Sequence, residues 1–209
     1  MNIAILLYDR FTALDAIGPY EVLSRLPGAE LRFVAAEPGP VRTDNGMLTL
    51  VAEHALADVR EPDIVLVPGG PGEVAARAGG DALEWLRAAD RTSTWTAAVC
   101  TGSLILAAAG LLDGRRATTH WLALEQLQEL GAEAVSERVV FDGKIVTAAG
   151  VSAGIDMALA LAAKVAGAQV AQAIQLGIEY DPQPPFDAGS PASAPPEIVE
   201  ALRSRSRFR

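Results

Sequence analysis

Cysteine and histidine are scarce in this sequence, which has one cysteine, Cys100, and two histidines, His54 and His120, in 209 residues. A single cysteine excludes an internal disulfide, and so few cysteine and histidine side chains argue against a zinc site. Aromatic residues make up only 5% of the chain, while half of all residues are hydrophobic. We therefore expect one large core built mainly from Ala, Val, Leu and Ile.

Basic residues and long apolar runs are also lacking. Lys and Arg number 17 against 26 Asp and Glu, which gives a formal net charge of −9. Nucleic acids and anionic membranes are bound by basic surfaces, so neither is an expected partner. No apolar run approaches the roughly 20 residues of a membrane helix, and the opening "MNIAILLYDR" lacks the basic start of a signal peptide. We expect a cytoplasmic protein.

The chain alternates between segments typical of buried strands and segments typical of helices. Strands are predicted at 2–8, 30–37, 63–72 and 94–99, and helices at 18–26, 79–91, 101–112, 120–131, 152–167 and 168–180. In the first helix, Pro19 suits the first turn. Hairpins are predicted at 41–54, around Asn45-Gly46, and at 138–150, around Asp142-Gly143. This order predicts an α/β fold with a mainly parallel sheet covered on both faces.

Composition changes after residue 180. Residues 181–196, "DPQPPFDAGSPASAPP", are rich in Pro, Ala, Gly and Ser and cannot form a helix. They are either a linker or an extended strap with Phe186 as its anchor. The residues that follow form a basic-ended helix or a frayed end. We therefore divide the chain into an α/β domain at 1–180 and a Pro-rich extension at 181–209, packed on the domain or on a dimer partner.

Three segments place unusual residues beyond the carboxyl ends of predicted strands, where parallel α/β sheets form their sites. Asp15 follows the first strand, Gly69 and Gly70 end the strand in "VPGGPG", and Cys100 follows "TWTAAV". The "GGPGEV" segment has the wrong glycine spacing for a dinucleotide fingerprint. These residues are the candidate site.

Cys100 has the sequence context of a nucleophile elbow, a tight turn between a strand and a helix. The helix N-terminus is expected to lower the thiol pKa, and Gly102 lets the backbone bend closely. The N–H groups of Thr101 and of the turn at Gly69 and Gly70 could then bind a developing negative charge. The alternative is a buried cysteine that acts only as a small hydrophobic residue.

Asp15 has two interpretations that spacing alone leaves open. It could be the N-cap of the helix that begins at "AIGPYEV". It could also be an acid beside the thiol, with a pKa raised by burial and by like charge. His54 lies in a polar run, and His120 begins a helix, where a cap or a core hydrogen bond is favoured. A Cys–His pair formed through the fold remains possible.

The segment "AVCTGSLILAAAGLLDGRRATTHW" resembles the elbow and following helix of the PfpI/ThiJ superfamily, which has the class I glutamine amidotransferase-like fold. "DAIGPYEVL", "DIVLVPGG" and "VTAAGVSAGIDMALALAAKVAG" extend the resemblance over nearly the whole chain, and "EYDPQPPFDAGSP" narrows it to the isonitrile hydratase subgroup. That subgroup adds water to an isocyanide to give an N-substituted formamide. The resemblance implies a flavodoxin-like three-layer sandwich, a homodimer, no metal and no organic cofactor. It also implies Cys100 as nucleophile, Asp15 as acid and Thr101 as a supporting residue.

Differences from other members of the superfamily favour this subgroup. Protease-like members carry His where this chain has Thr101, and many deglycase and glyoxalase-like members carry Glu where it has Asp15. Related transcription regulators share the "CTG…TTHW" block and continue into a helix-turn-helix region, whereas this sequence ends at Arg209. We expect a lyase acting on a small isocyanide. The alternative is a non-catalytic or redox-sensing module related to those regulators, in which Cys100 is oxidised.

Overall fold

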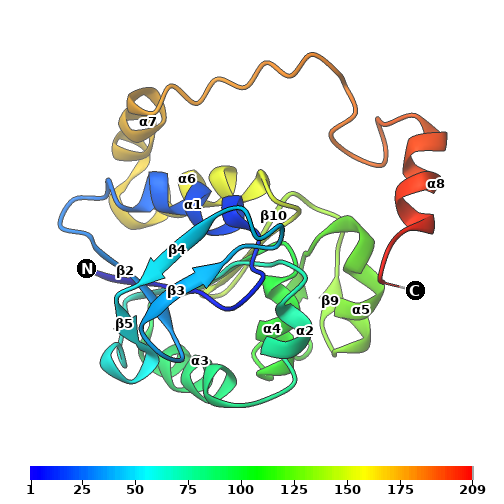
Figure 1. Ribbon diagram of the computed structural model, residues 1–209. Helices are drawn as coiled ribbons and strands as arrows, with labels where there is room; N and C mark the ends of the chain where they lie inside the picture. The colour runs from blue at the N-terminus through cyan, green and yellow to red at the C-terminus, as the bar shows by residue number, and fades with distance from the viewer. Residues whose placement is uncertain (209) are drawn as a thin grey trace.

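The computed structural model describes residues 1–208 and is built around a seven-stranded sheet (Figure 1). The strand order is β10-β11-β7-β6-β1-β2-β5. Adjacent strands are parallel except for the antiparallel pair β10 and β11. The strands are β1 (Asn2–Leu6), β2 (Glu30–Ala35), β5 (His54–Ala55), β6 (Ile64–Val67), β7 (Trp95–Val99), β10 (Val139–Asp142) and β11 (Ile145–Ala148).

Helices cover both faces of this sheet, as Figure 1 shows. One face carries α1 (Ala13–Leu23), α6 (Ala153–Ala166) and α7 (Ala168–Gly177), and the other carries α3 (Asp81–Thr92), α4 (Gly102–Ala108) and α5 (Leu124–Glu129). Successive strand residues point to opposite faces: in β1, Ile3 and Ile5 join the first core, and Ala4 and Leu6 join the second. The prediction of a three-layer α/β sandwich with a mainly parallel sheet is confirmed.

Shorter elements complete the described part of the chain. They are β3 (Gly39–Arg42), β4 (Thr49–Ala52), β8 (Arg116–Ala117), β9 (Glu133–Ala134), η1 (Leu56–Asp58), η2 (Trp121–Ala123), α2 (Glu73–Ala76) and α8 (Pro196–Ser204). Both predicted hairpins are present, as β3–β4 and β10–β11. Among residues 1–208, no helix combines the length and apolar composition needed to cross a bilayer.

Helix α1 begins earlier than the sequence predicted, which places Pro19 inside the helix rather than in its first turn. A proline there cannot donate to the carbonyl four residues earlier. Close packing against α6 accompanies this arrangement: a Cβ added at Gly18 would lie 3.0 Å from Ile155 Cγ1, and one added at Gly154 would lie 3.2 Å from Pro19 Cγ. Small residues on both helices therefore let α1 and α6 pack closely where Pro19 lies.

The segment that follows α7 leaves the body of the molecule. Residues 181–195 are almost entirely exposed, and Figure 1 shows them as an extended connection to α8. Phe186 is 78% exposed and does not pack on its own domain, so of the predicted roles a linker or an anchor on a dimer partner stay predictions. Helix α8 has no buried residue. The connection is held at its two ends and not along its length.

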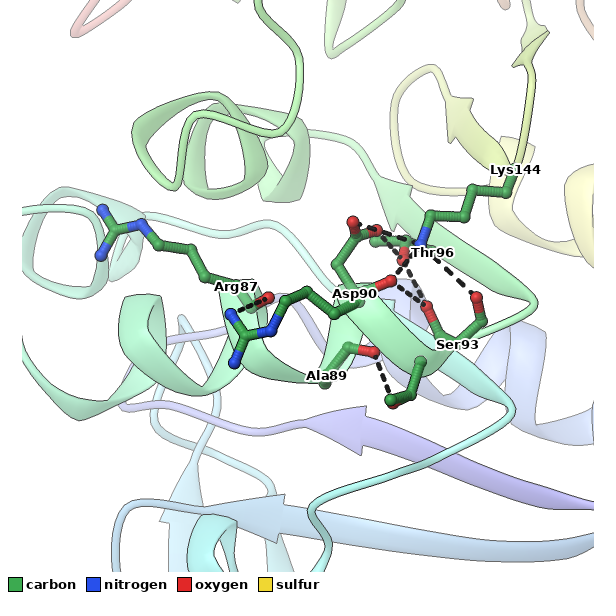
Figure 2. Close-up of polar contacts among 8 residues, drawn as sticks. Arg87, Ala89, Asp90, Ser93, Thr96 and Lys144 are labelled. Carbon is green, nitrogen blue, oxygen red and sulfur yellow. Dashed lines mark hydrogen bonds and ion pairs between the residues drawn. The ribbon is translucent and has the colours of Figure 1, made fainter.

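A polar cluster lies where β7 and β11 begin, at the opposite end of β7 from Cys100. Figure 2 shows Lys144 reaching toward Asp90, Ser93 and Thr96. Lys144 Nζ lies 3.2 Å from Asp90 Oδ2, and Thr96 Oγ1 donates to Asp90 Oδ1 at 2.7 Å. These contacts join the end of α3 to the two strands and stabilise the sheet at a distance from the elbow.

Candidate active site

Cys100 occupies a strained turn between β7 and α4. Its φ angle is +56°, in the left-handed region that residues with a side chain rarely adopt. Its N–H donates to Ala148 O at 3.0 Å, and its carbonyl accepts from Ser103 Oγ and Thr119 Oγ1, each at 3.0 Å. The surrounding hydrogen bonds thus hold both backbone groups of Cys100 in the strained conformation.

Two glycines let the neighbouring backbones approach this turn. A Cβ at Gly102 would lie 2.1 Å from Val67 O, so no side chain fits between α4 and the end of β6. A Cβ at Gly69 would lie 2.5 Å from Thr101 N and 2.9 Å from Asp15 Oδ2. The elbow, the turn after β6 and the start of α1 therefore meet at one point.

Asp15 lies within α1 and is fully buried. The N-cap of α1 is Thr12, so the interpretation of Asp15 as the cap is wrong. Asp15 Oδ2 accepts a hydrogen bond of 2.9 Å from Gly69 N, whereas Oδ1 is buried with no hydrogen-bond partner within residues 1–208. Burial raises the pKa of Asp15 to about 7, although the Gly69 N–H and the Cys100 side chain act to lower it.

The thiol of Cys100 does not have the lowered pKa that its place before a helix predicted. Burial raises the pKa of Cys100 well above its ordinary value, and the negative charge of Asp15 raises it further. The backbone N–H groups of Thr101 and Val151 lower it, but less than burial raises it. Cys100 is only 6% exposed, and α4 is too short for its dipole to offset this desolvation. The resting thiol is protonated near neutral pH, beside a carboxyl that titrates there.

Thr101 completes the contacts around the turn after β6. Its Oγ1 accepts a hydrogen bond of 2.9 Å from Gly70 N. The structure therefore brings together Asp15, Gly69, Gly70, Cys100 and Thr101, as the sequence indicated. The N–H groups of both glycines already donate to side chains, Gly69 to Asp15 and Gly70 to Thr101. An anion-binding role for this backbone stays a prediction.

A cavity of about 220 Å³ opens onto the sulfur. It is lined by Thr12, Gly70, Pro71, Cys100, Thr101, His120, Leu122, Val151 and Ser206–Phe208. A second cavity of about 380 Å³ adjoins it and shares His120 and Val151 with it. Among the described residues, no group of three or more His, Cys, Asp or Glu side chains is arranged to hold a metal ion.

The two histidines differ in their relation to this cavity. His54 lies on the edge strand β5, outside the lining. His120 Nδ1 accepts a hydrogen bond of 3.3 Å from Leu122 N, so the imidazole carries its proton on Nε2 when neutral. Burial, together with the charge of Arg207, lowers the pKa of His120. The sequence favoured a capping role, which the structure shows, but it did not place His120 in the cavity.

The segment Ser206–Phe208 is part of the cavity that the sequence did not reveal. The sequence left open a basic-ended helix or a frayed end for the last residues; the structure has the helix, α8, and the three residues of this segment beyond it line the cavity with Cys100. Arg207 also reaches Glu73, a fully buried carboxylate on α2. No local pattern signals the contact between Arg207 and Glu73, because the two residues lie 134 positions apart in the sequence.

Comparison with known proteins shows which proteins this chain is similar to. The model of the DJ-1/PfpI family matches residues 1–164. The chain is 42% identical over 206 residues to the isonitrile hydratase of Pseudomonas putida, covering 99% of this chain and 90% of that protein. It also resembles the crystal structure of a THiJ/PfpI family protein from Pseudomonas syringae, with a TM-score of 0.94, 37% identity and coverage of 97% of this chain and 84% of the other.

A transcription regulator shares part of this similarity. The HTH-type transcriptional regulator CdhR of Pseudomonas aeruginosa is 37% identical over 163 residues, which cover 76% of this chain. The same match spans 48% of the regulator, so about half of that protein has no counterpart in the matched region. Proteins similar to this chain therefore include an enzyme, isonitrile hydratase, and a transcription regulator, CdhR.

Proposed function

Because this chain belongs to the DJ-1/PfpI family, we propose that it is an isonitrile hydratase, which converts an isocyanide and water into an N-substituted formamide. The observation that carries the proposal is a buried thiol, Cys100, beside a buried carboxyl, Asp15, at a small cavity. The similarity to the Pseudomonas putida isonitrile hydratase over almost the full chain supports it.

In the first step the sulfur of Cys100 attacks the terminal carbon of R–N≡C. The ionised Asp15 carboxylate takes the thiol proton as the C–S bond forms, and then gives that proton to the same carbon. The product is a thioimidate, R–N=CH–S–Cys100, and Asp15 is again ionised. A carboxyl with a pKa of about 7 is suited to both transfers, because it accepts and releases a proton near neutral pH.

In the second step water adds to the carbon of the thioimidate. The water oxygen bonds to carbon and one water proton reaches the nitrogen, which gives R–NH–CH(OH)–S–Cys100. The C–S bond then breaks, the carbonyl forms, and the hydroxyl proton returns to sulfur through Asp15. The products are the formamide R–NH–CHO and the free thiol. These steps balance with water alone and need neither a metal nor an organic cofactor.

Thr101 has a supporting role in this scheme. Its hydroxyl accepts from Gly70 N, so it fixes the turn after β6 against the elbow. Its own N–H acts on the Cys100 sulfur and favours the charge that develops there on departure. A cavity of about 220 Å³ suits a small neutral substrate that has little hydrogen-bonding capacity.

The proposal includes a homodimer as the working form. Residues 181–195 extend away from their own domain, and Phe186 on this segment is 78% exposed. Leu176 at the end of α7 is 80% exposed. A second copy of the chain packed against α7 and this segment would cover both apolar side chains.

A regulator-like sensor is the second candidate, favoured by the similarity to CdhR. In that case oxidation of Cys100 would carry the signal. Oxidation requires an accessible thiolate, whereas Cys100 is buried and its pKa is raised. The site is therefore better arranged for proton-coupled attack on a bound small molecule.

The deciding experiment incubates the protein with cyclohexyl isocyanide and measures N-cyclohexylformamide by mass spectrometry. We expect turnover by the wild type and none by Cys100→Ser, since a serine hydroxyl is a far weaker nucleophile. Thr92→Val, on the exposed surface of α3, is the matched control and should retain activity. Absence of formamide with alkyl and aryl isocyanides alike would reject the hydratase, and trapping of a sulfenic acid at Cys100 would then support the sensor.

A further inference from the structure

The segment Ser206–Phe208 forms one wall of the Cys100 cavity, although no earlier residue of the Pro-rich extension takes part in it. Phe208 packs against the core on the α3, α4 and α5 side of the sheet, and its N–H donates to Ser206 Oγ at 3.0 Å. The Arg207 guanidinium lies 4.5 Å from the centre of the Phe208 ring. These three residues are thus arranged as one compact unit beside the sulfur.

Arg207 joins this wall to the turn that carries the candidate site. Its Nη1 donates to Pro71 O at 3.0 Å, and its Nη2 donates to Gly70 O at 3.2 Å. The N–H of the same Gly70 is bound to Thr101 beside Cys100. A planar guanidinium can hold two carbonyls at once in this way, whereas a lysine ammonium cannot reproduce the paired geometry. The wall is therefore connected directly to the turn that positions the elbow.

Glu73 supplies the charge that makes this contact specific. Its carboxylate is fully buried on α2, with Oε2 2.7 Å from Arg77 Nε and Oε1 3.2 Å from Arg207 Nη1. A buried carboxylate is costly unless it is paired. Arg77, the C-cap of α2, pairs with one oxygen of the carboxylate, and Arg207 reaches the other oxygen from a distant part of the chain. The ion pair with Glu73 therefore fixes the position of the Arg207 side chain on this surface.

The rest of the extension, from residue 181 to the end of α8, makes fewer contacts with the α/β domain than Arg207 and Phe208 do. Residues 181–195 are exposed, and α8 buries none of its residues. A cavity of about 580 Å³ separates part of α8 from the residues around Trp121, and the contact between Arg203 and the Trp121 ring spans 5.8 Å. The position of the cavity wall therefore depends mainly on Arg207 and Phe208.

We propose that Arg207 is a specificity-determining residue, which holds Ser206–Phe208 against the Gly70 turn and so limits the size of the group that can enter beside Cys100. This inference rests on the proposed function for its substrate, an isocyanide R–N≡C, and it states that R is small and uncharged. The charge of the guanidinium is already paired with Glu73, and one N–H on each of its two terminal nitrogens donates to a carbonyl, so we assign Arg207 a positioning role and not a role in binding an anion. Release of Arg207 would widen the cavity toward α8.

Alkylation of Cys100 tests the wall without requiring turnover. The chain has one cysteine, so the site of reaction is unambiguous. The probes are iodoacetamide and N-benzyliodoacetamide, which carry the same reactive group and differ in size. Because both reagents react with the same thiolate, a change in the ionised fraction of Cys100 affects both rates equally and cancels in their ratio. In the wild type we expect iodoacetamide to react much faster than the benzyl reagent.

In Arg207→Gln we expect the benzyl reagent to gain at least about tenfold relative to iodoacetamide, since three contacts of a charged donor are lost. Arg205→Gln removes the same charge from an exposed neighbouring position and is the matched control. If Arg207→Gln fails to fold because the buried Glu73 carboxylate then has only Arg77 as an ion-pair partner, the double variant with Glu73→Gln removes that charge and should show the same gain. An unchanged ratio, or an equal change in Arg205→Gln, overturns the inference.

Hydration of two isocyanides separates this inference from the proposed function. If the wild type hydrates a small alkyl isocyanide, Arg207→Gln should raise kcat/KM for a bulky aryl isocyanide relative to the small one. If no isocyanide is hydrated but the alkylation ratio shifts in Arg207→Gln alone, the proposed function is rejected and the wall is upheld. If hydration occurs and the alkylation ratio does not shift, the proposed function stands and the role of Arg207 is rejected.

Discussion

The backbone N–H of Gly69 donates a hydrogen bond of 2.9 Å to Asp15 Oδ2, across 54 residues of sequence. This bond fixes the carboxyl of α1 to the turn after β6, and the other carboxyl oxygen has no hydrogen-bond partner within the described chain. Burial raises the pKa of Asp15 to about 7, because the Gly69 N–H and the Cys100 side chain offset only part of the cost of desolvating the carboxylate. The same arrangement leaves Asp15 able to exchange a proton with its surroundings near neutral pH.

The pH dependence of kcat/KM follows from this titration. Below about pH 7 both Asp15 and Cys100 carry protons, and the carboxyl cannot accept the thiol proton. We therefore expect kcat/KM for isocyanide hydration to rise as pH increases through about 7. Steady-state kinetics from pH 5 to 9 would measure this, and a flat profile over that range would contradict the role of Asp15 as proton acceptor.

Thr96 tests whether the polar cluster at the far end of β7 is purely structural. Thr96→Val removes the hydroxyl that donates to Asp90 Oδ1, a part-buried carboxylate oxygen, and a hydrogen bond to a charged group contributes about 1–3 kcal/mol. We expect urea unfolding to show a loss of this size, while kcat/KM changes by less than about twofold, because the cluster and Cys100 lie at opposite ends of the strand. Thr92→Val is the control on the exposed side of α3 and should alter stability little. A large loss of activity in Thr96→Val would show that the two ends of β7 are coupled.

Local sequence patterns were sufficient to predict the sheet, most of its helices and the convergence of Asp15, Gly69 and Cys100. Apolar runs such as 2–8 and 94–99 mark buried strands, and the carboxyl ends of parallel strands meet at one edge. The choice between a helix cap and an acid at Asp15, however, needed the structure, because both roles place an aspartate near the start of a helix.

Other features depend on contacts that no local pattern encodes. The pKa of Cys100 is set by burial under several elements rather than by the helix that follows it. The close packing of Gly18 and Pro19 in α1 against α6 joins positions far apart in the sequence. Arg207 appears in the sequence as one arginine in a basic run, and only the position of Glu73 on α2 gives it a specific partner.

Dimer formation can be measured with a change at Phe186. If a second copy covers this side chain, Phe186→Ser should weaken the dimer by at least about tenfold, since burial of a Phe side chain contributes on the order of 1.5–3 kcal/mol. Sedimentation equilibrium of wild type and variant would measure the dissociation constant, with Asp187→Ser as a control at the next exposed position. A wild-type mass of one chain at all concentrations would reject the dimer, and an unchanged constant in Phe186→Ser would exclude this side chain from the interface.

Asp15→Asn separates the catalytic role of Asp15 from its structural one. Asn has nearly the same size, and its side-chain oxygen can still accept from Gly69 N, so the local packing should be preserved. It cannot take the thiol proton, and we expect kcat/KM to fall by on the order of 10²–10⁴, the usual range for general acid–base catalysis. The inflection near pH 7 should disappear with it. Asp9→Asn, an exposed position close to the site, should leave both activity and pH profile unchanged.

Although Asp15→Asn should lose activity, its free energy of unfolding should rise above that of the wild type at high pH. The pKa of Asp15 is raised from 3.8 to about 7 in the folded protein, so the folded state binds this proton more tightly than the unfolded state. That contribution to stability is complete below pH 3.8 and is lost as pH rises through about 7. Asn does not ionise, and therefore Asp15→Asn should gain stability relative to the wild type between pH 5 and pH 8, by on the order of 1–4 kcal/mol, since one pKa unit corresponds to about 1.4 kcal/mol. Urea unfolding at the two pH values would measure this difference. A variant that loses turnover while gaining stability at pH 8 shows that the buried carboxyl is retained for proton transfer, whereas normal turnover would return Asp15 to a structural role.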